Sequence, residues 1–332
     1  MMPSSRYTVM LPVCHGGRFL EKALTSLADV FAPEGGYDVI IAGRKKDAAD
    51  IFKRRALTHW ILVESNGNRS CALNAACHAA KGAYWVFSDD DCVFPADWLL
   101  NLDRSLAEHP EAAVVGGADR PTGFGTDFDA ALDAVLNSWM GTGGTRTDRA
   151  FKTGVYYPKL WNMAVRADAA RKVAPDGPGG LLIFDPALPV HEDVDLVDRI
   201  RSTNGEVVYA PSVCVEHSRD TTYGAFVRRN LAMAHMCRKH GIHRLPHLAL
   251  VATLAGIPFT GILSLFMPAL QIFAGSAFGL YTGAVLLTGI KGAMKKKRKT
   301  LSFWIPALLV SMQAARAAGF LLPPRTGYGR NV

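Results

Sequence analysis

The stretch WVFSDDDCVFPADWL, residues 85–99, decides the fold because it joins an apolar β-strand to three consecutive aspartates and then to the start of a helix. Alternate side chains of a strand share a face, so Asp89 and Asp91 can point together while Asp90 points away. Two converging carboxylates repel each other unless a divalent cation neutralises them, and such hard oxygen ligands suit magnesium or manganese. The alternative is a solvated turn in which Asp91 caps the helix that follows.

Apolar strands recur on both sides of this stretch and alternate with amphipathic helices. This alternation predicts an α/β domain with a mainly parallel sheet, helices on both faces, and ligands at the carboxyl ends of the strands, where the aspartates lie. Between residues 120 and 159 the periodicity is weak, and we expect an irregular segment with one short helix at 129–140. The other expected strands are 7–13, 37–43, 59–65, 83–91, 112–118 and 206–217, and the other expected helices are 18–31, 70–82, 94–110 and 191–205.

Charge is divided unevenly along the 332 residues. The first 220 hold all 29 acidic side chains and 23 of the 37 lysines and arginines, whereas the rest holds 14 basic side chains and no acidic one. No charged residue occurs at 245–290, which suffices for two membrane passes of about 20 residues each, turning near Met267 and Pro268. The basic clusters at 238–244 and 291–299 would then share the cytoplasmic face. We expect a membrane as the partner and no nucleic acid, with a buried helical hairpin of a soluble protein as the alternative.

The two ends of the chain give further signals. The first residues lack a long apolar core with a cleavage site, so the N-terminal half is expected to stay in the cytosol. The apolar segment 301–324 contains Pro306 and Arg316, and a central arginine costs roughly 2.5 to 3.5 kcal/mol on insertion scales, which favours an interfacial or re-entrant helix over a third span. Arg228 and Arg229 either engage lipid phosphates or form a plain juxtamembrane charge cluster. The six cysteines have no metal-ligand spacing and are expected in the core.

Three blocks of sequence resemble the nucleotide-sugar glycosyltransferases of family 2. They begin with VMLPVCHGGRFLEKALTSL at residue 9, NGNRSCALNAACHAAKGAYWVFSDDDCVFPADWL at residue 66, and WNMAVRADAARKV at residue 161, the last block ending in VCVEH at residue 217. The resemblance covers roughly residues 7–220 and implies a Rossmann-like GT-A domain that binds a nucleotide sugar, followed by a helical membrane region. We therefore expect a GT-A domain at 1–222, a basic juxtamembrane helix at 223–245, a transmembrane hairpin at 246–290, and a basic cluster with an interfacial or third membrane helix at 291–332.

The resemblance assigns roles to the residues that match the family's motifs. It implies that Asp89 and Asp91 hold a divalent metal, Mg or Mn, on the donor diphosphate, with Asp91 the more direct ligand and Asp90 in a supporting role toward the donor. His217 matches a histidine that contacts metal or phosphate, although a single histidine at a strand end is often structural. Arg69 could contact the diphosphate or be an ordinary surface arginine. The remaining positions implied on the donor side are Pro12, Val13, Asn74 and Asn162.

Glu192 and Asp193 match the family's acidic pair at the start of a helix. A base must take the proton from an acceptor hydroxyl as its oxygen attacks the anomeric carbon, and Asp193 is the candidate, with Glu192 orienting the acceptor. The alternative is a pair of acids favourably placed in the first turn of a helix. One departure concerns the nucleotide: the second strand ends IIAGRKKDAAD and lacks the family's usual acidic residues for uracil and ribose, so UDP is only the default.

These expectations combine into one function. The chain is expected to be a metal-dependent, inverting glycosyltransferase that moves one sugar from a nucleotide sugar to a polyprenyl-diphosphate-linked or other membrane-associated acceptor. The tail resembles bacterial exopolysaccharide transferases of the succinoglycan type, which implies a multi-pass protein of the inner membrane with its catalytic domain on the cytoplasmic face. Two spans are too few for a polymer channel and no QxxRW motif occurs, so transfer of single sugars is preferred. The alternative is a catalytically silent, membrane-anchored GT-A protein that binds or scaffolds; a nucleotidyltransferase would leave the acidic pair unexplained.

Overall fold

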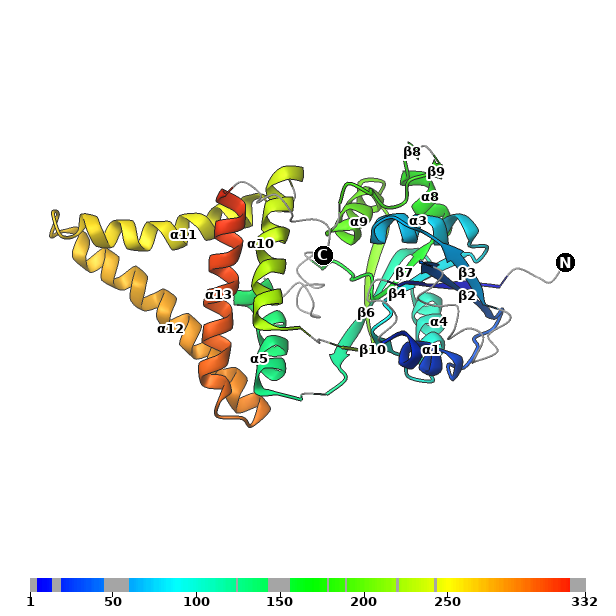
Figure 1. Ribbon diagram of the computed structural model, residues 1–332, viewed down its shortest axis with the longest axis horizontal. Helices are drawn as coiled ribbons and strands as arrows, with labels where there is room; N and C mark the ends of the chain where they lie inside the picture. The colour runs from blue at the N-terminus through cyan, green and yellow to red at the C-terminus, as the bar shows by residue number, and fades with distance from the viewer. Residues whose placement is uncertain are drawn as a thin grey trace. The chain divides into compact units, whose positions relative to one another are not determined.

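A computed structural model describes residues 5–13, 19–44, 60–123, 125–142, 156–177, 179–188, 190–218, 221–241 and 244–322 of the chain. The chain forms two compact units, drawn in Figure 1. The first comprises Met1–Thr122 with Thr145–Ser218, and the second comprises Gly123–Gly144 with Arg219–Val332. From the sequence, residues 123–144 are expected to belong to the domain at 1–222. In the structure they group with the C-terminal helices. The first unit is the α/β domain that the sequence predicts.

An eight-stranded sheet forms the centre of the first unit, in the order β3-β2-β1-β4-β7-β6-β10-β5. Neighbours β3, β2, β1 and β4 are parallel, as are β6 and β10, whereas β7 runs antiparallel between β4 and β6, and β5 runs antiparallel to the end of β10. The strands are β1 (Tyr7–Pro12), β2 (Tyr37–Gly43), β3 (Ile61–Glu64), β4 (Tyr84–Ser88), β5 (Cys92–Val93), β6 (Ala112–Pro121), β7 (Asn162–Arg166) and β10 (Glu206–His217), and β8 (Asp176–Gly177) pairs separately with β9 (Gly180–Leu181).

Helices cover both faces of this sheet because its central strands are apolar on both sides. Val9 and Leu11 of β1 belong to one core and Met10 to the other, as the two-residue period of a strand requires. The first core is closed by α1 (Leu20–Ala28) and α4 (Trp98–Glu108), and the second by α3 (Arg69–Ala79), α8 (Ala167–Val173) and α9 (Glu192–Ser202). The predicted α/β sheet with helices on both faces is confirmed, but the sheet is mixed instead of mainly parallel, because β7 and β5 run antiparallel to their neighbours.

The second unit is helical. Its elements are α5 (Asp127–Leu136), α6 (Trp139–Thr142), α10 (Tyr223–His240), α11 (Arg244–Leu263), α12 (Leu270–Lys296) and α13 (Leu301–Leu321). The core of this unit buries one side of α13 against α5, with Phe226 from α10 and Ala293 from α12. The short helix expected at 129–140 is present as α5 and α6, and the Thr126 side chain caps α5 reciprocally with Asp129.

Among the described residues, two helices of this unit, α12 and α13, are long and apolar enough to cross a membrane by length and composition. The apolar part of α11, His247–Leu263, is shorter. The turn expected near Met267 and Pro268 lies between α11 and α12, as predicted. The segment from residue 301, expected to be interfacial or re-entrant, forms one unbroken helix, and half of its apolar window is buried inside the protein (50%), compared with 11% for α12.

Candidate active site

The residues that the sequence singles out lie on several elements that meet at one edge of the sheet. Asp89, Asp90 and Asp91 follow the carboxyl end of β4, and His217 ends β10. The antiparallel strand β7 begins at this edge with Asn162, paired with Ser88 at the end of β4. Arg69 opens α3 and Glu192 opens α9. The aspartates after β4, His217 at the end of β10, and the helix starts at Arg69 and Glu192 therefore lie at the edge of the sheet that the sequence predicts.

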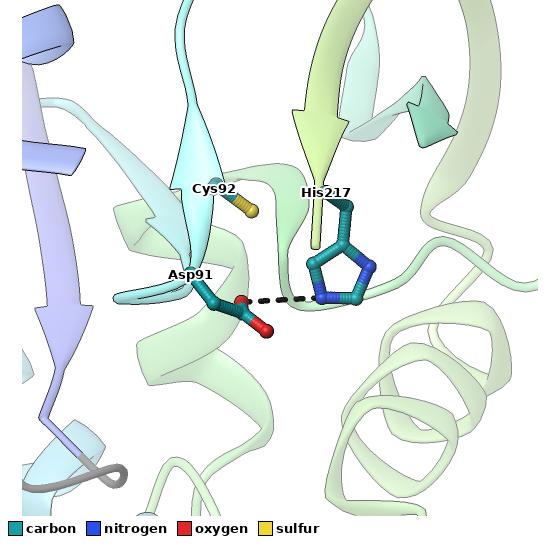
Figure 2. A group of neighbouring side chains, drawn as sticks. All are labelled: Asp91, Cys92 and His217. Atoms are coloured by element: carbon teal, nitrogen blue, oxygen red, sulfur yellow. Dashed lines mark ion pairs between the residues drawn. The ribbon is translucent and has the colours of Figure 1, made fainter. Parts of the chain in front are cut away.

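Asp91 and His217, two of the three positions predicted at the metal, lie next to each other. The His217 Nε2 atom lies 3.2 Å from Asp91 Oδ1, and the two side chains point toward each other in Figure 2. Backbone pairing fixes them, because Cys92 of β5 lies opposite His217 and the Ser218 amide donates to the Asp91 carbonyl at 3.1 Å. The indole of Trp161 stacks on the His217 ring with centroids 4.8 Å apart, which holds the imidazole in place.

A divalent cation fits this pair by its donor set. One oxygen of Asp91, the Cys92 sulfur and one ring nitrogen of His217 all lie within 4.8 Å of one another. Burial, followed by the charges of Asp89 and Asp91, raises the pKa of the Cys92 thiol well above its usual value, so it stays protonated and is a poor ligand. The carboxylate, with further positions for phosphate oxygens and water, suits Mg or Mn, and the imidazole favours a transition metal such as Mn.

Asp89 makes a different contact from the one expected. Its carboxylate accepts a hydrogen bond from the Arg69 guanidinium, and it is not part of the group formed by Asp91 and His217. Burial raises the pKa of Asp89, and Arg69 acts against this shift. Asp90 is also buried, with 1% of its surface exposed. Of the predicted metal positions, the structure therefore joins Asp91 to His217 and places Asp89 with Arg69.

Arg69 links the aspartates to the acidic pair of α9. While one end of its guanidinium holds Asp89, its Nε atom lies 3.6 Å from Glu192 Oε1. Burial raises the pKa of Glu192 to about 7, with Arg69 opposing the shift and Asp193 adding to it. Arg69 thus pairs with two acids of the candidate site, and its contact with a diphosphate stays a prediction.

Asp193 is held in its ionised form. Its Oδ1 accepts the Val194 amide at 2.8 Å, and its Oδ2 lies 3.4 Å from the Lys159 ammonium. Burial acts to raise the pKa of Asp193, but Lys159, His191 and further contacts outweigh it, so the pKa is lower than usual. The sequence did not single out Lys159, because it lies at the end of the stretch with weak periodicity.

Two predicted donor-side asparagines are fully engaged by protein groups. Asn162 donates to the carbonyls of Ala118 and Val213, both at 2.7 Å, and accepts from the Trp98 indole at 3.0 Å. Asn74 donates to the Phe184 carbonyl at 2.7 Å and accepts the Phe184 amide at 2.9 Å. These contacts favour structural roles over contact with a donor sugar.

The α3 helix positions the chain that leads into the acidic pair. Besides Asn74, Asn68 donates to the Pro186 carbonyl at 2.7 Å and Ser70 to the Leu188 carbonyl at 3.2 Å. These bonds fix residues 184–188, just before α9.

Pro12 and Val13, two further positions predicted on the donor side, lie at the same edge of the sheet. Pro12 ends β1, and the Val13 amide donates to the Ala42 carbonyl at 2.8 Å.

Comparison with known proteins shows the family of the chain. The sequence profile described as glycosyl transferase family 2 matches residues 8–173. The chain belongs to this family. The family match and the fold identify the first unit as a glycosyltransferase domain of the GT-A type. None of the curated proteins compared with the chain matches it.

Solved structures share the fold of the glycosyltransferase. The mannosyltransferase PcManGT from Pyrobaculum calidifontis, determined with GDP-Man and Mn²⁺, is 19% identical with a TM-score of 0.56, over 95% of this chain and 88% of that chain. Residues 1–349 of TarS from S. aureus are 12% identical with a TM-score of 0.49, over 93% of this chain and 91% of that chain. At 19% identity, the similarity to PcManGT is one of fold alone.

Proposed function

We propose that this glycosyltransferase moves one sugar from a nucleotide-sugar donor, UDP-linked by default, to a lipid-linked acceptor, with inversion at the anomeric carbon and with a divalent metal. The observation that carries the proposal is Arg69, which bridges Asp89 at the end of β4 to Glu192 at the start of α9. This contact unites the side expected to bind the diphosphate with the side expected to activate the acceptor.

The metal would be held by Asp91 and His217, and when bound it would offset the negative charge that develops on the leaving nucleoside diphosphate. Arg69 adds a fixed positive charge on the same side. Because the Asp89 carboxylate is already paired with Arg69, Asp89 acts by orienting this guanidinium. The GDP-Man and Mn²⁺ of PcManGT, which is similar only in fold, are compatible with such a donor side.

Asp193 would act as the general base. As the acceptor oxygen attacks the anomeric carbon, its proton passes to the Asp193 carboxylate, and the bond between that carbon and the diphosphate oxygen breaks. A single displacement of this kind inverts the configuration. Lys159 and the Val194 amide keep the carboxylate deprotonated and fixed in direction. Glu192, buried beside Arg69, would orient the acceptor.

The helical unit supports an acceptor at a membrane. Its α12 helix is long and apolar enough to enter a bilayer, and the basic residues that follow it suit the anionic cytoplasmic face. We propose that this unit tethers the domain to the cytoplasmic face of the inner membrane, where a polyprenyl-diphosphate acceptor for cell-surface polysaccharide synthesis would be presented. Asp91 contacts His217, and Asp193 contacts Lys159 and the Val194 amide. These intact contacts favour an active enzyme over a catalytically silent scaffold protein.

The test is a transfer assay on membranes that contain the full chain. Labelled nucleotide sugars, including UDP-glucose and GDP-mannose, are incubated with an extract of lipid-linked acceptors, with and without EDTA. We expect transfer from one donor, loss with EDTA, and recovery with Mn²⁺ or Mg²⁺. Transfer that is unaffected by EDTA would contradict the metal role, and the Asp91→Asn variant should show the same loss as EDTA. A control variant, Asp97→Asn, lies outside the site and should keep the activity.

A further inference from the structure

Large exposed apolar side chains gather on the hairpin formed by α11, the turn at 264–269, and α12. Leu265, Phe266 and Ile272 expose 76%, 79% and 82% of their surface. The groove between the two arms, about 530 Å³, is also mostly apolar and is lined by residues such as Ile257 and Phe278. A surface of this size and kind marks a contact with a membrane or another protein.

The other helices of the unit, α5, α6, α10 and α13, form what we call the helical base. One side of α13 is covered there, although Trp139, Phe303 and Leu321 remain exposed. Ile305, Leu308 and Met312 of α13 are fully buried in the core shared with α5. Figure 1 shows α13 beside α10 and α5, with the hairpin, in yellow and orange, extending from them. The helical base therefore has a buried core, and no residue of the outer hairpin, 248–280, belongs to it.

Charged and polar groups run through the helical base. Lys296 pairs with Asp133 at 2.6 Å and Arg298 with Asp127 at 3.1 Å. In the middle of α13, Arg316 donates to Asn230 of α10 at 2.9 Å and to the Gly141 carbonyl at 2.8 Å. Taking these groups into hydrocarbon would be costly, whereas helices with one apolar side and one charged side are stable at a membrane surface.

The part of the hairpin that extends beyond the helical base is shorter than a bilayer is thick, although the whole of α12 is long enough to cross one. The ring of His247, near the start of α11, stacks on Phe320 of α13, and Tyr281 of α12 donates to Gln313 of α13 at 2.6 Å. Beyond these contacts, α11 continues from His247 to Leu263, and α12 has only the shorter part between Leu270 and Tyr281. The α11 arm therefore has about 16 residues and reaches about 24 Å. The hydrocarbon core alone is about 30 Å thick.

The turn of the hairpin is also built to remain in hydrocarbon. It contains Leu265, Phe266 and Met267, and no charged residue. Six amides of the turn and its edges bond to nearby carbonyls: Ser264 donates to Thr260, the three apolar residues donate to carbonyls at 262 and 263, and Leu270 and Gln271 donate to 267 and 268. Lipid-exposed backbone requires this kind of internal hydrogen bonding.

We propose that the α11–α12 hairpin enters one leaflet and turns back inside the bilayer, so that the protein is monotopic and both ends of the hairpin stay on the cytoplasmic face. The basic residues at 295–299 complement the anionic headgroups at that face. This arrangement replaces the two crossings that the sequence alone favoured. It rests on the membrane attachment in the proposed function but not on catalysis.

The test maps the accessibility of single cysteines in the full chain. Phe266→Cys and Leu265→Cys place a thiol at the turn, and Lys299→Cys places one at the exposed segment just after α12 as the matched control. Right-side-out spheroplasts and inside-out membrane vesicles are treated with a membrane-impermeant maleimide, and labelling is measured on the peptide by mass spectrometry. Native cysteines therefore do not interfere.

We expect the turn thiols to be labelled from neither side and at least tenfold more after detergent is added, while the Lys299→Cys thiol is labelled only in inside-out vesicles. Labelling of the turn in spheroplasts would show a crossing, and labelling of the turn in inside-out vesicles without detergent would show a hairpin outside the bilayer. Extraction of the protein by alkaline carbonate would also overturn the proposal. Because no readout depends on turnover, an inactive protein with this labelling pattern would contradict only the proposed function.

Discussion

The Lys159 ammonium lies 3.4 Å from the Asp193 carboxylate, and both side chains are largely shielded from solvent. This contact lowers the pKa of Asp193 although burial acts to raise it. His191, Arg69 and Asp89 also act on the pair formed by Glu192 and Asp193. If Asp193 is the base, as we propose, Lys159 acts through it as a positioning residue.

Replacing Lys159 by methionine is expected to raise the pKa of Asp193. The base would then become protonated at a higher pH, so the acidic limb of the kcat/KM profile should move upward by about one pH unit, which corresponds to roughly 1.4 kcal/mol. The measurement is the pH dependence of transfer by Lys159→Met, with Lys159→Arg expected to keep the wild-type limb. Lys172→Met, on the exposed side of α8, is the matched control. An unchanged limb in Lys159→Met would refute this role.

Glu192 should make the folded protein less stable as pH rises. Burial raises its pKa from 4.5 to about 7, so the folded state holds this proton more tightly than the unfolded state does. The resulting stabilisation is complete below pH 4.5 and is lost as pH rises through about 7. In Glu192→Gln this part of the pH dependence should vanish, as measured by thermal denaturation in detergent between these limits. Identical slopes for the two proteins would show that Glu192 titrates normally.

Asn74 is expected to be a structural residue that matters for activity through the position of α9. Asn74→Ala removes both hydrogen bonds to the buried backbone of Phe184, at a cost of about 1 to 3 kcal/mol in the free energy of unfolding. Cleavage by a protease near residues 184–188 should become faster. Asn101→Ala, which removes only an exposed contact with Arg104, is the control and should change little. If Asn74 instead contacts the donor, its alanine variant would raise KM and leave stability unchanged.

His217 is expected to contribute directly to metal affinity. His217→Ala removes one of the two proposed protein ligands, so the Kd for Mn²⁺, measured by calorimetry with UDP present, should rise at least tenfold. Trp161→Leu should weaken binding less, because it only releases the ring that stacks on His217. His109→Ala, at the exposed end of α4, provides a histidine control. Equal Mn²⁺ affinity in wild type and His217→Ala would exclude this ligand.

The sequence predicts the sheet and the edge where the site forms because both follow from local patterns. The two-residue period of strands such as β1, together with the helices between strands, is sufficient to predict an α/β sheet, and the end of β4 then places the aspartates at its carboxyl edge. The family blocks add Glu192, Asp193 and His217. These residues do meet at one edge, although their catalytic roles remain predictions.

Partners that lie far apart in the sequence could not be predicted in the same way. Asn74 and Phe184 are separated by 110 positions, and no local pattern indicates their pairing. The two contacts of Arg69, with Asp89 on one side and Glu192 on the other, likewise depend on tertiary structure. The segment 123–144 has helical periodicity in α5, but periodicity does not reveal that its apolar side packs on α13.

Transfer by Asp193→Asn tests the central claim most directly. Asparagine keeps the size of the side chain and removes its ability to accept a proton, while Asp198→Asn, on the exposed side of α9, is the matched control. With Mn²⁺, the identified nucleotide sugar and the lipid acceptor extract, single-turnover transfer by Asp193→Asn should fall by about 10² to 10⁴, with donor binding retained. Full activity of Asp193→Asn would contradict the proposal that this carboxylate is the base.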